Sequence, residues 1–219
     1  MTEVTINKQA RLSQHLASPS VATLGNSSEL DCSRLSPHFT LGELCKTSAK
    51  TPDGNIPSHV HIENLKRLCG WLEELRERYN LRYVLPLSRG SQRGSDPPHC
   101  SPAQTTPNPS YSGGEASGRG SEDPIIINSG YRSEAVNKAV GGVKGSNHLT
   151  GCAADIRVAG IEQLVRYATI LLDISDESQE DFDELLLERS PRGTYWLHFA
   201  VRPPSQENRR KVSLIQSLR

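Results

Sequence analysis

The sequence of 219 residues has few of the features that mark membrane or nucleic-acid-binding proteins. It contains no apolar run close to the roughly 18 residues that a membrane-spanning helix needs. Its 25 Lys and Arg residues are balanced by 25 Asp and Glu residues, so no excess of positive charge is present to attract phosphate groups. The sequence therefore predicts neither membrane insertion nor a nucleic-acid partner.

Cysteine is also scarce, and its pattern argues against two common uses. The five cysteines are odd in number, widely spaced and without a Cys-x-x-Cys pair. This pattern favours reduced thiols over a disulfide framework or a cysteine zinc site. The first residues lack the basic and apolar segments of a secretory signal peptide. We therefore expect synthesis in the cytoplasm without a Sec signal peptide.

The apolar content is low and unevenly distributed along the chain. Hydrophobic residues make up 35% of the sequence, against roughly 45–50% in typical globular domains. Two polar stretches, 1–33 and 85–123, cannot bury enough apolar surface to order their backbone. We expect a disordered arm at 1–33 and one folded domain at 34–204, interrupted by a disordered insertion at 85–123. A charged tail is expected at 205–219.

Helix signals are clearest in the first half of the folded region. Thr40 and Glu43 have the spacing of a capping box, which predicts a short helix. A longer helix is predicted from Ser58, because apolar residues then recur at intervals of three and four and form one stripe. The stripe consists of Leu65, Leu68, Leu72, Leu75 and Tyr79. This pattern indicates a helix that packs on a core.

The second half of the chain combines predicted strands with predicted helices. Short β-branched or alternating apolar runs indicate the strands, and the last two strands form an antiparallel hairpin. The predicted strands are 125–127, 153–158, 182–188 and 195–201, and the predicted helices are 133–140 and 161–174. Helices with a small antiparallel sheet define the α+β class. We expect this sheet to carry the functional site and to pack against several helices.

Possible metal ligands gather on one face of the predicted sheet. Strand alternation turns Asp155 away from the apolar face of its strand and does the same for His198. His148 precedes Asp155 by seven residues. Two imidazoles and one carboxylate are a zinc-binding set that leaves a fourth position for water, as in catalytic zinc sites. Each residue alone is more often an ordinary hydrogen-bonded side chain, so the prediction rests on the combination.

The same residues belong to a longer motif. The pattern S-x-H-x-x-G-x-A-x-D spans Ser146 to Asp155, and W-x-H ends at His198. The sequence resembles the zinc D-alanyl-D-alanine carboxypeptidase-like peptidases, which cut peptidoglycan stem peptides and share their fold with the Hedgehog signalling domain. This resemblance implies that zinc is bound by His148, Asp155 and His198.

The resemblance covers roughly residues 35–84 and 124–201 and includes the segment Ser-Gly-Tyr-Arg-Ser at 129–133. It implies that Arg132 contacts substrate, where a guanidinium can bind a carboxylate or stabilise a developing oxyanion. The alternative is a solvated charge at the start of a helix. Ser146 can bond to substrate or orient its own loop, and the sequence does not separate these two roles.

The general base is harder to identify. Hydrolysis at a metal centre requires a group that accepts a proton from the attacking water. Family members often carry an acid or a histidine three positions before the last ligand, but Tyr195 stands there. Glu188 is our candidate, and it shares a face with His198 if it pairs across from Trp196. The weaker candidates, which we expect to be solvated, are Asp183 and Glu184.

The resemblance implies a zinc-dependent cell-wall peptidase that acts on peptidoglycan stem peptides. D-Ala-D-Ala carboxypeptidase cleavage is our first choice, and an L-Ala-D-Glu endopeptidase of the phage-lysin type is the alternative. The missing signal peptide favours phage-type release to the cell wall. A non-catalytic zinc-containing binding or virion-structural module is the alternative from another class, because one fold supports several functions. We expect a monomer.

Overall fold

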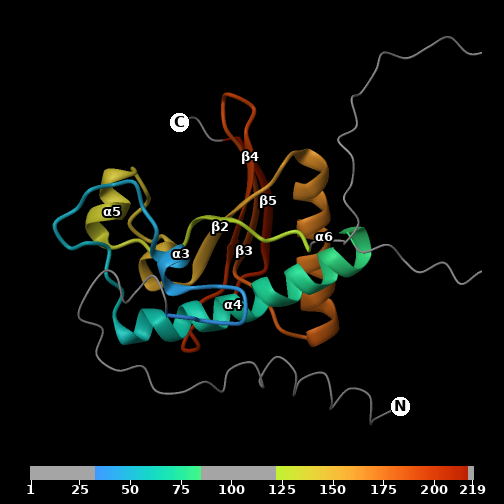
Figure 1. The fold of residues 1–219 in the computed structure, drawn as a ribbon, viewed down its shortest axis with the longest axis horizontal. Coiled ribbons are helices and arrows are strands. Elements are labelled where there is room, and N and C mark those ends of the chain that lie inside the picture. Colours follow the sequence, from blue (N-terminus) through green and yellow to red (C-terminus); the bar gives the residue numbers. More distant parts are fainter. Residues whose placement is uncertain (1–32, 85–121, 217–219) are drawn as a thin grey trace, which may run out of the picture.

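The computed structural model describes residues 33–84 and 122–216 (Figure 1). The expected disordered arm at 1–33 lies outside the described residues except for Ser33. The expected insertion at 85–123 also lies outside them, except for its last two residues. The α-helices are α3 (Leu41–Cys45), α4 (His59–Tyr79), α5 (Glu134–Ala139) and α6 (Ile161–Ser178). Shorter helical turns are η1 (Asn80–Val84) and η2 (Asn147–Thr150).

Five strands form a single sheet. They are β1 (Ile127–Ser129), β2 (Ala153–Arg157), β3 (Glu184–Arg189), β4 (Tyr195–Ala200) and β5 (Lys211–Gln216). Their order across the sheet is β1-β2-β4-β3-β5. Neighbouring strands are antiparallel except β3 and β5, which are parallel. The predicted α+β class is confirmed, but the sheet is mixed rather than wholly antiparallel.

Strand β5 lies within residues 205–219, where the sequence predicts a charged tail. Residues 211–216 pair with β3 along its whole length and form an edge of the sheet. The side chains of β5 are exposed or half-buried, including Leu214 at 74% exposure. Main-chain hydrogen bonding to β3, rather than apolar burial, therefore holds this strand.

The helices α4 and α6 cover one face of the sheet. Ser58 and His61 form a capping box at the start of α4, and the predicted leucine stripe is fully buried. Leu197 and Phe199 of β4 belong to the same core. In Figure 1, α4 crosses in front of the strands and α6 stands alongside them. Because alternate strand residues point to opposite faces, the other face of the sheet is free to carry polar side chains.

The two ends of the long insertion are held next to each other. Asn80, at the end of α4, donates from Nδ2 to the Asp123 carbonyl at 3.1 Å. The Asp123 amide donates to Oδ1 of Asn80 at 2.6 Å. Arg76 also forms an ion pair with Glu122 at 2.6 Å. The domain can therefore accept many residues here, since the entropy of closing a loop changes slowly with its length.

Candidate metal centre

Strands β2 and β4 bring two of the predicted ligands together. Asp155 lies directly opposite His198 in the antiparallel register. Oδ1 of Asp155 is 2.8 Å from Nδ1 of His198. Both side chains point to the face of the sheet that α4 and α6 do not cover, as strand alternation predicts.

The third predicted ligand, His148, comes from the helical turn η2. Gly151 ends this turn in the left-handed region, with φ of 71°. The imidazole is buried, and its Nε2 lies 3.2 Å from Oδ1 of Asp155. Its Nδ1 is 2.6 Å from the carbonyl of Gly130 and donates to it. This hydrogen bond fixes the tautomer, so the free lone pair of Nε2 points to the centre of the cluster.

The donor set fits a divalent metal ion. His148, Asp155 and His198 each offer one ligand atom, and these atoms lie within 4.8 Å of one another. Two nitrogens and one oxygen are the set that catalytic zinc sites use, with one position left for water or substrate. The structure thus positions all three predicted residues for a metal ion.

The protonation of the cluster suits this role. Burial lowers the pKa of His148, which keeps its imidazole neutral. Burial alone would raise the pKa of Asp155, but the two imidazoles hold it well below its usual range. Burial would lower the pKa of His198, yet hydrogen bonding to Asp155 and Glu184 raises it to about 9. Because a proton competes with a metal for His198, metal binding should strengthen as pH rises.

Arg132 lies at the cluster and not in solvent. Its Nη2 donates to Oδ2 of Asp155, and its Nε donates to the hydroxyl of Ser129 at 2.8 Å. The guanidinium therefore orients the carboxylate and leaves Oδ1 to face the imidazoles. This contact excludes the alternative of a solvated charge at a helix start. A contact between Arg132 and substrate stays a prediction.

Ser146 has a role in its own loop. It is the N-cap of η2, and its hydroxyl accepts a hydrogen bond from the His148 amide at 3.4 Å. The loop-orienting role is therefore present in the structure, next to a predicted ligand. Substrate binding by Ser146 stays a prediction.

The pairing register of β3 and β4 decides whether Glu188, the predicted general base, faces the cluster. Glu188 pairs with Trp196, which is the register that puts it on the same face as His198. Burial raises the pKa of this half-buried carboxyl group. Tyr195 points the other way and packs against the core, so it cannot act as the base at this cluster.

Asp183 and Glu184, the two acids expected to be solvated, instead take part in ion pairs next to the cluster. Asp183 is fully buried and forms ion pairs with Arg202 and Arg209 at 2.8 and 2.7 Å. Glu184 has a side chain only 16% exposed, and its Oε2 is 3.7 Å from Nε2 of His198. The cations that stabilise both acids come from residues 202–211, whose position the sequence did not reveal.

Sequence reasoning considered Glu184 only as a weaker, solvated candidate for the base, and it missed the Gly130 carbonyl. Strand alternation could have found Glu184, because it pairs with Ala200 and so shares a face with His198. Gly130 had a weaker signal. A Cβ at this position would lie 2.3 Å from the carbonyl oxygen of Leu44, so only glycine fits. The sequence shows a glycine there but not the close approach of the two chain segments.

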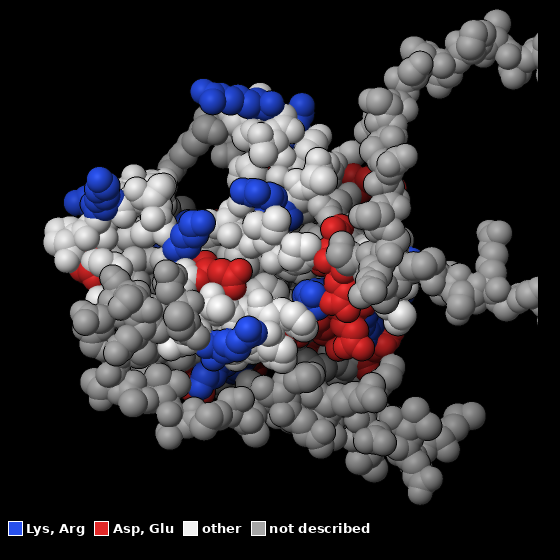
Figure 2. All heavy atoms as spheres, viewed as in Figure 1, with Lys and Arg blue, Asp and Glu red and all other residues white. Residues whose placement is uncertain are grey.

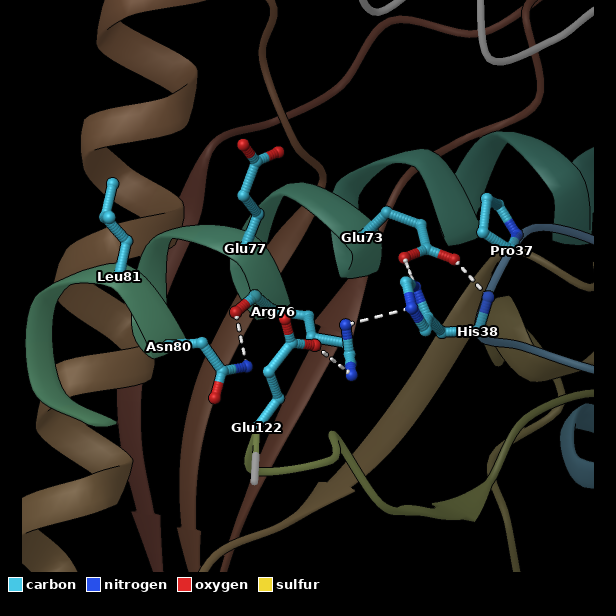
Figure 3. A pocket seen from close by; sticks show the side chains of 8 residues that line it. All are labelled: Pro37, His38, Glu73, Arg76, Glu77, Asn80, Leu81 and Glu122. Atoms are coloured by element: carbon cyan, nitrogen blue, oxygen red, sulfur yellow. Dashed lines mark hydrogen bonds and ion pairs between the residues drawn. The ribbon is translucent and has the colours of Figure 1, made fainter. Parts of the chain in front are cut away.

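A hollow of about 430 Å³ lies beside the C-terminal half of α4 (Figure 3). Figure 2 shows acidic side chains gathered around this part of the helix. In the hollow, His38 contacts Glu73 through Nδ1 at 2.7 Å and Arg76 through Nε2 at 3.1 Å. Arg76 also pairs with Glu122. Because these groups satisfy one another, the hollow is lined by a structural ion-pair network.

The α+β domain thus presents a His/Asp/His cluster, whose donor atoms suit a divalent metal ion, on the sheet face that α4 and α6 do not cover. A family model described as Peptidase M15 matches residues 117–173. Over these residues, which make up less than half of the chain, the sequence is similar to M15 peptidases. The matched range contains His148 and Asp155, whereas His198 lies beyond it.

A search of curated proteins finds no match to this chain. Within residues 33–84 and 122–216, no helix is both long and apolar enough to cross a membrane.

Proposed function

We propose that the protein is a zinc metallopeptidase that hydrolyses an amide bond in peptidoglycan stem peptides. D-Ala-D-Ala carboxypeptidase cleavage is our first choice of reaction. The observation that carries this proposal is the convergence of His148, Asp155 and His198 on the open face of the sheet, with Glu188 on the same face. A cluster of this kind needs only one chain, which supports a monomeric enzyme.

Each residue has a distinct part in the proposed reaction. A zinc ion held by the three ligands would polarise the scissile carbonyl and lower the pKa of a water molecule. Glu188 takes the proton of the attacking water and returns it to the leaving amine. A carboxylate whose pKa is raised by burial suits this role, because general bases work best when their pKa lies closer to the working pH.

Arg132 is proposed to bind substrate next to the metal centre. Its Nε and Nη2 are used by Ser129 and Asp155, so Nη1 is the nitrogen that would face a substrate carbonyl or carboxylate. The exposed Arg157 lies on the same face of β2, two residues after Asp155. Two cations beside the cluster suit stem peptides, which carry free carboxylates.

The L-Ala-D-Glu endopeptidase remains the alternative within the same chemistry. It uses the same metal centre and general base, and differs in the shape of the substrate groove. Either enzyme must reach the cell wall, and we propose phage-type release for this step.

Digestion of defined muropeptides tests the proposal. The purified zinc-loaded protein is incubated with pentapeptide muropeptides, and the products are identified by mass. Loss of one terminal alanine is the expected result, whereas cleavage between L-Ala and D-Glu identifies the endopeptidase. Asp155→Ala should abolish cleavage, and the surface variant Asp181→Asn should retain it. If the zinc-loaded parent cleaves neither bond, the protein is a non-catalytic module and the proposal is wrong.

A further inference from the structure

Glu184 connects the metal centre to the C-terminal strand. Its Oε2 faces the centre, at 3.7 Å from Nε2 of His198 and 3.3 Å from Nδ2 of Asn147. Its Oε1 faces the opposite way, at 3.0 Å from Nη2 of Arg209 and 3.2 Å from Nζ of Lys211. One carboxylate thus bridges a predicted zinc ligand and two cations located 25 and 27 residues further along the chain.

We propose that Glu184 is a positioning residue that holds His198 with Nδ1 turned to the metal, and that the C-terminal segment holds Glu184 in place. This inference rests on the proposed function, because it assigns a role around the same zinc site. It adds a residue and a chain segment that neither the motif nor the matched range 117–173 contains.

The two nitrogens of His198 support this role for Glu184. Nδ1 lies 2.8 Å from Oδ1 of Asp155, inside the cluster of ligand atoms. Nε2 is on the far side of the ring and faces Glu184. A zinc-bound imidazole typically donates its other N–H to a carboxylate or carbonyl, which fixes the tautomer and increases the basicity of the ligand. His148 has such a partner in the Gly130 carbonyl, and Glu184 is the corresponding partner for His198.

The C-terminal cations keep this carboxylate available for His198. Strand β5 pairs with β3 so that Lys211 lies directly opposite Glu184. Arg209 donates to both Glu184 and the buried Asp183, and Asp183 also accepts from Asn147. These cations hold Oε1, while Oε2 faces His198 and accepts a hydrogen bond from Nδ2 of Asn147. An ion pair with Lys211 engages only Oε1 of Glu184. It does not account for the position of Oε2, which faces the imidazole of His198.

Zinc affinity measures this role without any peptide substrate. Zinc binding is measured by competition with a chromophoric chelator for the parent, Glu184→Ala and Glu184→Gln. We expect Glu184→Ala to weaken zinc binding by about tenfold to a hundredfold, as for other partners of metal-bound histidines. Glu184→Gln should lose less, because its amide oxygen can still accept the Nε2 hydrogen. Asp181→Asn removes an exposed carboxylate three residues before β3 and should bind zinc like the parent.

A matched pair of variants tests the C-terminal link. Lys211→Gln removes a cation that contacts Glu184, whereas Arg210→Gln removes its neighbour, which pairs with Asp176 and Asp181 instead. We expect Lys211→Gln to weaken zinc binding by about threefold, as suits a half-exposed ion pair, and Arg210→Gln to leave it unchanged. Equal zinc affinity in these two variants would overturn the role of the C-terminal segment.

The ring nitrogens of His198 give a readout that a merely structural role would not change. In the zinc-loaded parent labelled with ¹⁵N, NMR should show the proton on Nε2 and none on Nδ1. A proton on Nδ1 would overturn the inference even if Glu184→Ala does not fold. Parental zinc affinity in a folded Glu184→Ala variant would overturn it as well, while leaving the proposed peptidase activity intact. A parent that binds no zinc would overturn both.

Discussion

Replacing Asp183 by Asn tests whether the buried ion-pair network behind the metal centre stabilises the fold. The carboxylate is fully buried and is bonded to Arg202, Arg209 and Asn147. Burial alone would raise the pKa of Asp183, but hydrogen bonds from Arg209 and Asn147 outweigh it and lower the pKa from 3.8 to about 2. At 1.36 kcal/mol per pH unit, this difference corresponds to about 2 kcal/mol of folding free energy.

The pH dependence of this contribution has a definite sign. Because the pKa of Asp183 is lower in the folded than in the unfolded state, its ionisation stabilises the protein above about pH 4. The contribution falls as pH decreases towards 2, and about half of it is lost at pH 3. Asn cannot ionise. The Asp183→Asn variant should therefore be less stable than the parent by about 2 kcal/mol at pH 7 and by about half as much at pH 3.

Urea unfolding followed by tryptophan fluorescence at pH 7, 4 and 3 measures these differences. Asp181→Asn is the matched control, since Asp181 is 55% exposed and pairs with Arg210 at 3.3 Å. It should change the unfolding free energy by less than about 0.5 kcal/mol. A parent and an Asp183→Asn variant of equal stability at pH 7 would refute the reasoning. So would a difference in stability that is the same at pH 7 and pH 3.

Four further predictions concern the site and the insertion. Glu188→Gln should still bind zinc, because Glu188 is not a predicted ligand. It should lower muropeptide turnover by about a hundredfold. Turnover near the parental rate would show that another group is the general base. Since burial raises the pKa of Glu188, kcat/KM should fall as pH decreases through a value above that of an ordinary glutamate, and a pH profile checks this. Gly151→Ala should lower the melting temperature and the zinc content. The alanine Cβ would lie 2.6 Å from the carbonyl oxygen of His61, and the residue has a positive φ. Unchanged values would contradict this close approach of η2 to α4. Replacing residues 86–120 by a short Gly/Ser linker should leave zinc content intact, because Asn80 and Asp123 already join the two ends, and loss of folding would argue against this.

The sequence by itself indicated the candidate metal ligands and determined the core helix. The alternation around Asp155 and His198 is a short-range pattern that strand geometry converts into a polar face, whereas His148 comes from the helical turn η2 and was indicated by its motif. The leucine stripe of α4 is equally local, since a helical period of 3.6 residues makes one apolar side. The structure buries this stripe and brings the three residues close enough to hold a metal ion, while metal binding by them stays a prediction.

Only the tertiary structure decided how the remaining residues act together. Glu188 shares a face with His198 because it pairs with Trp196, and a slip of one residue in this register would have turned it into the core. Arg132 meets Asp155 through contacts between segments 23 residues apart, and Glu184 meets His198 only because β3 and β4 pair. Strand β5 contains Val212, Leu214 and Ile215, but none of its side chains is fully buried, and it pairs with β3 through main-chain bonds. Strand register and ion pairs connect segments that are distant in sequence, so a local sequence pattern cannot predict these contacts.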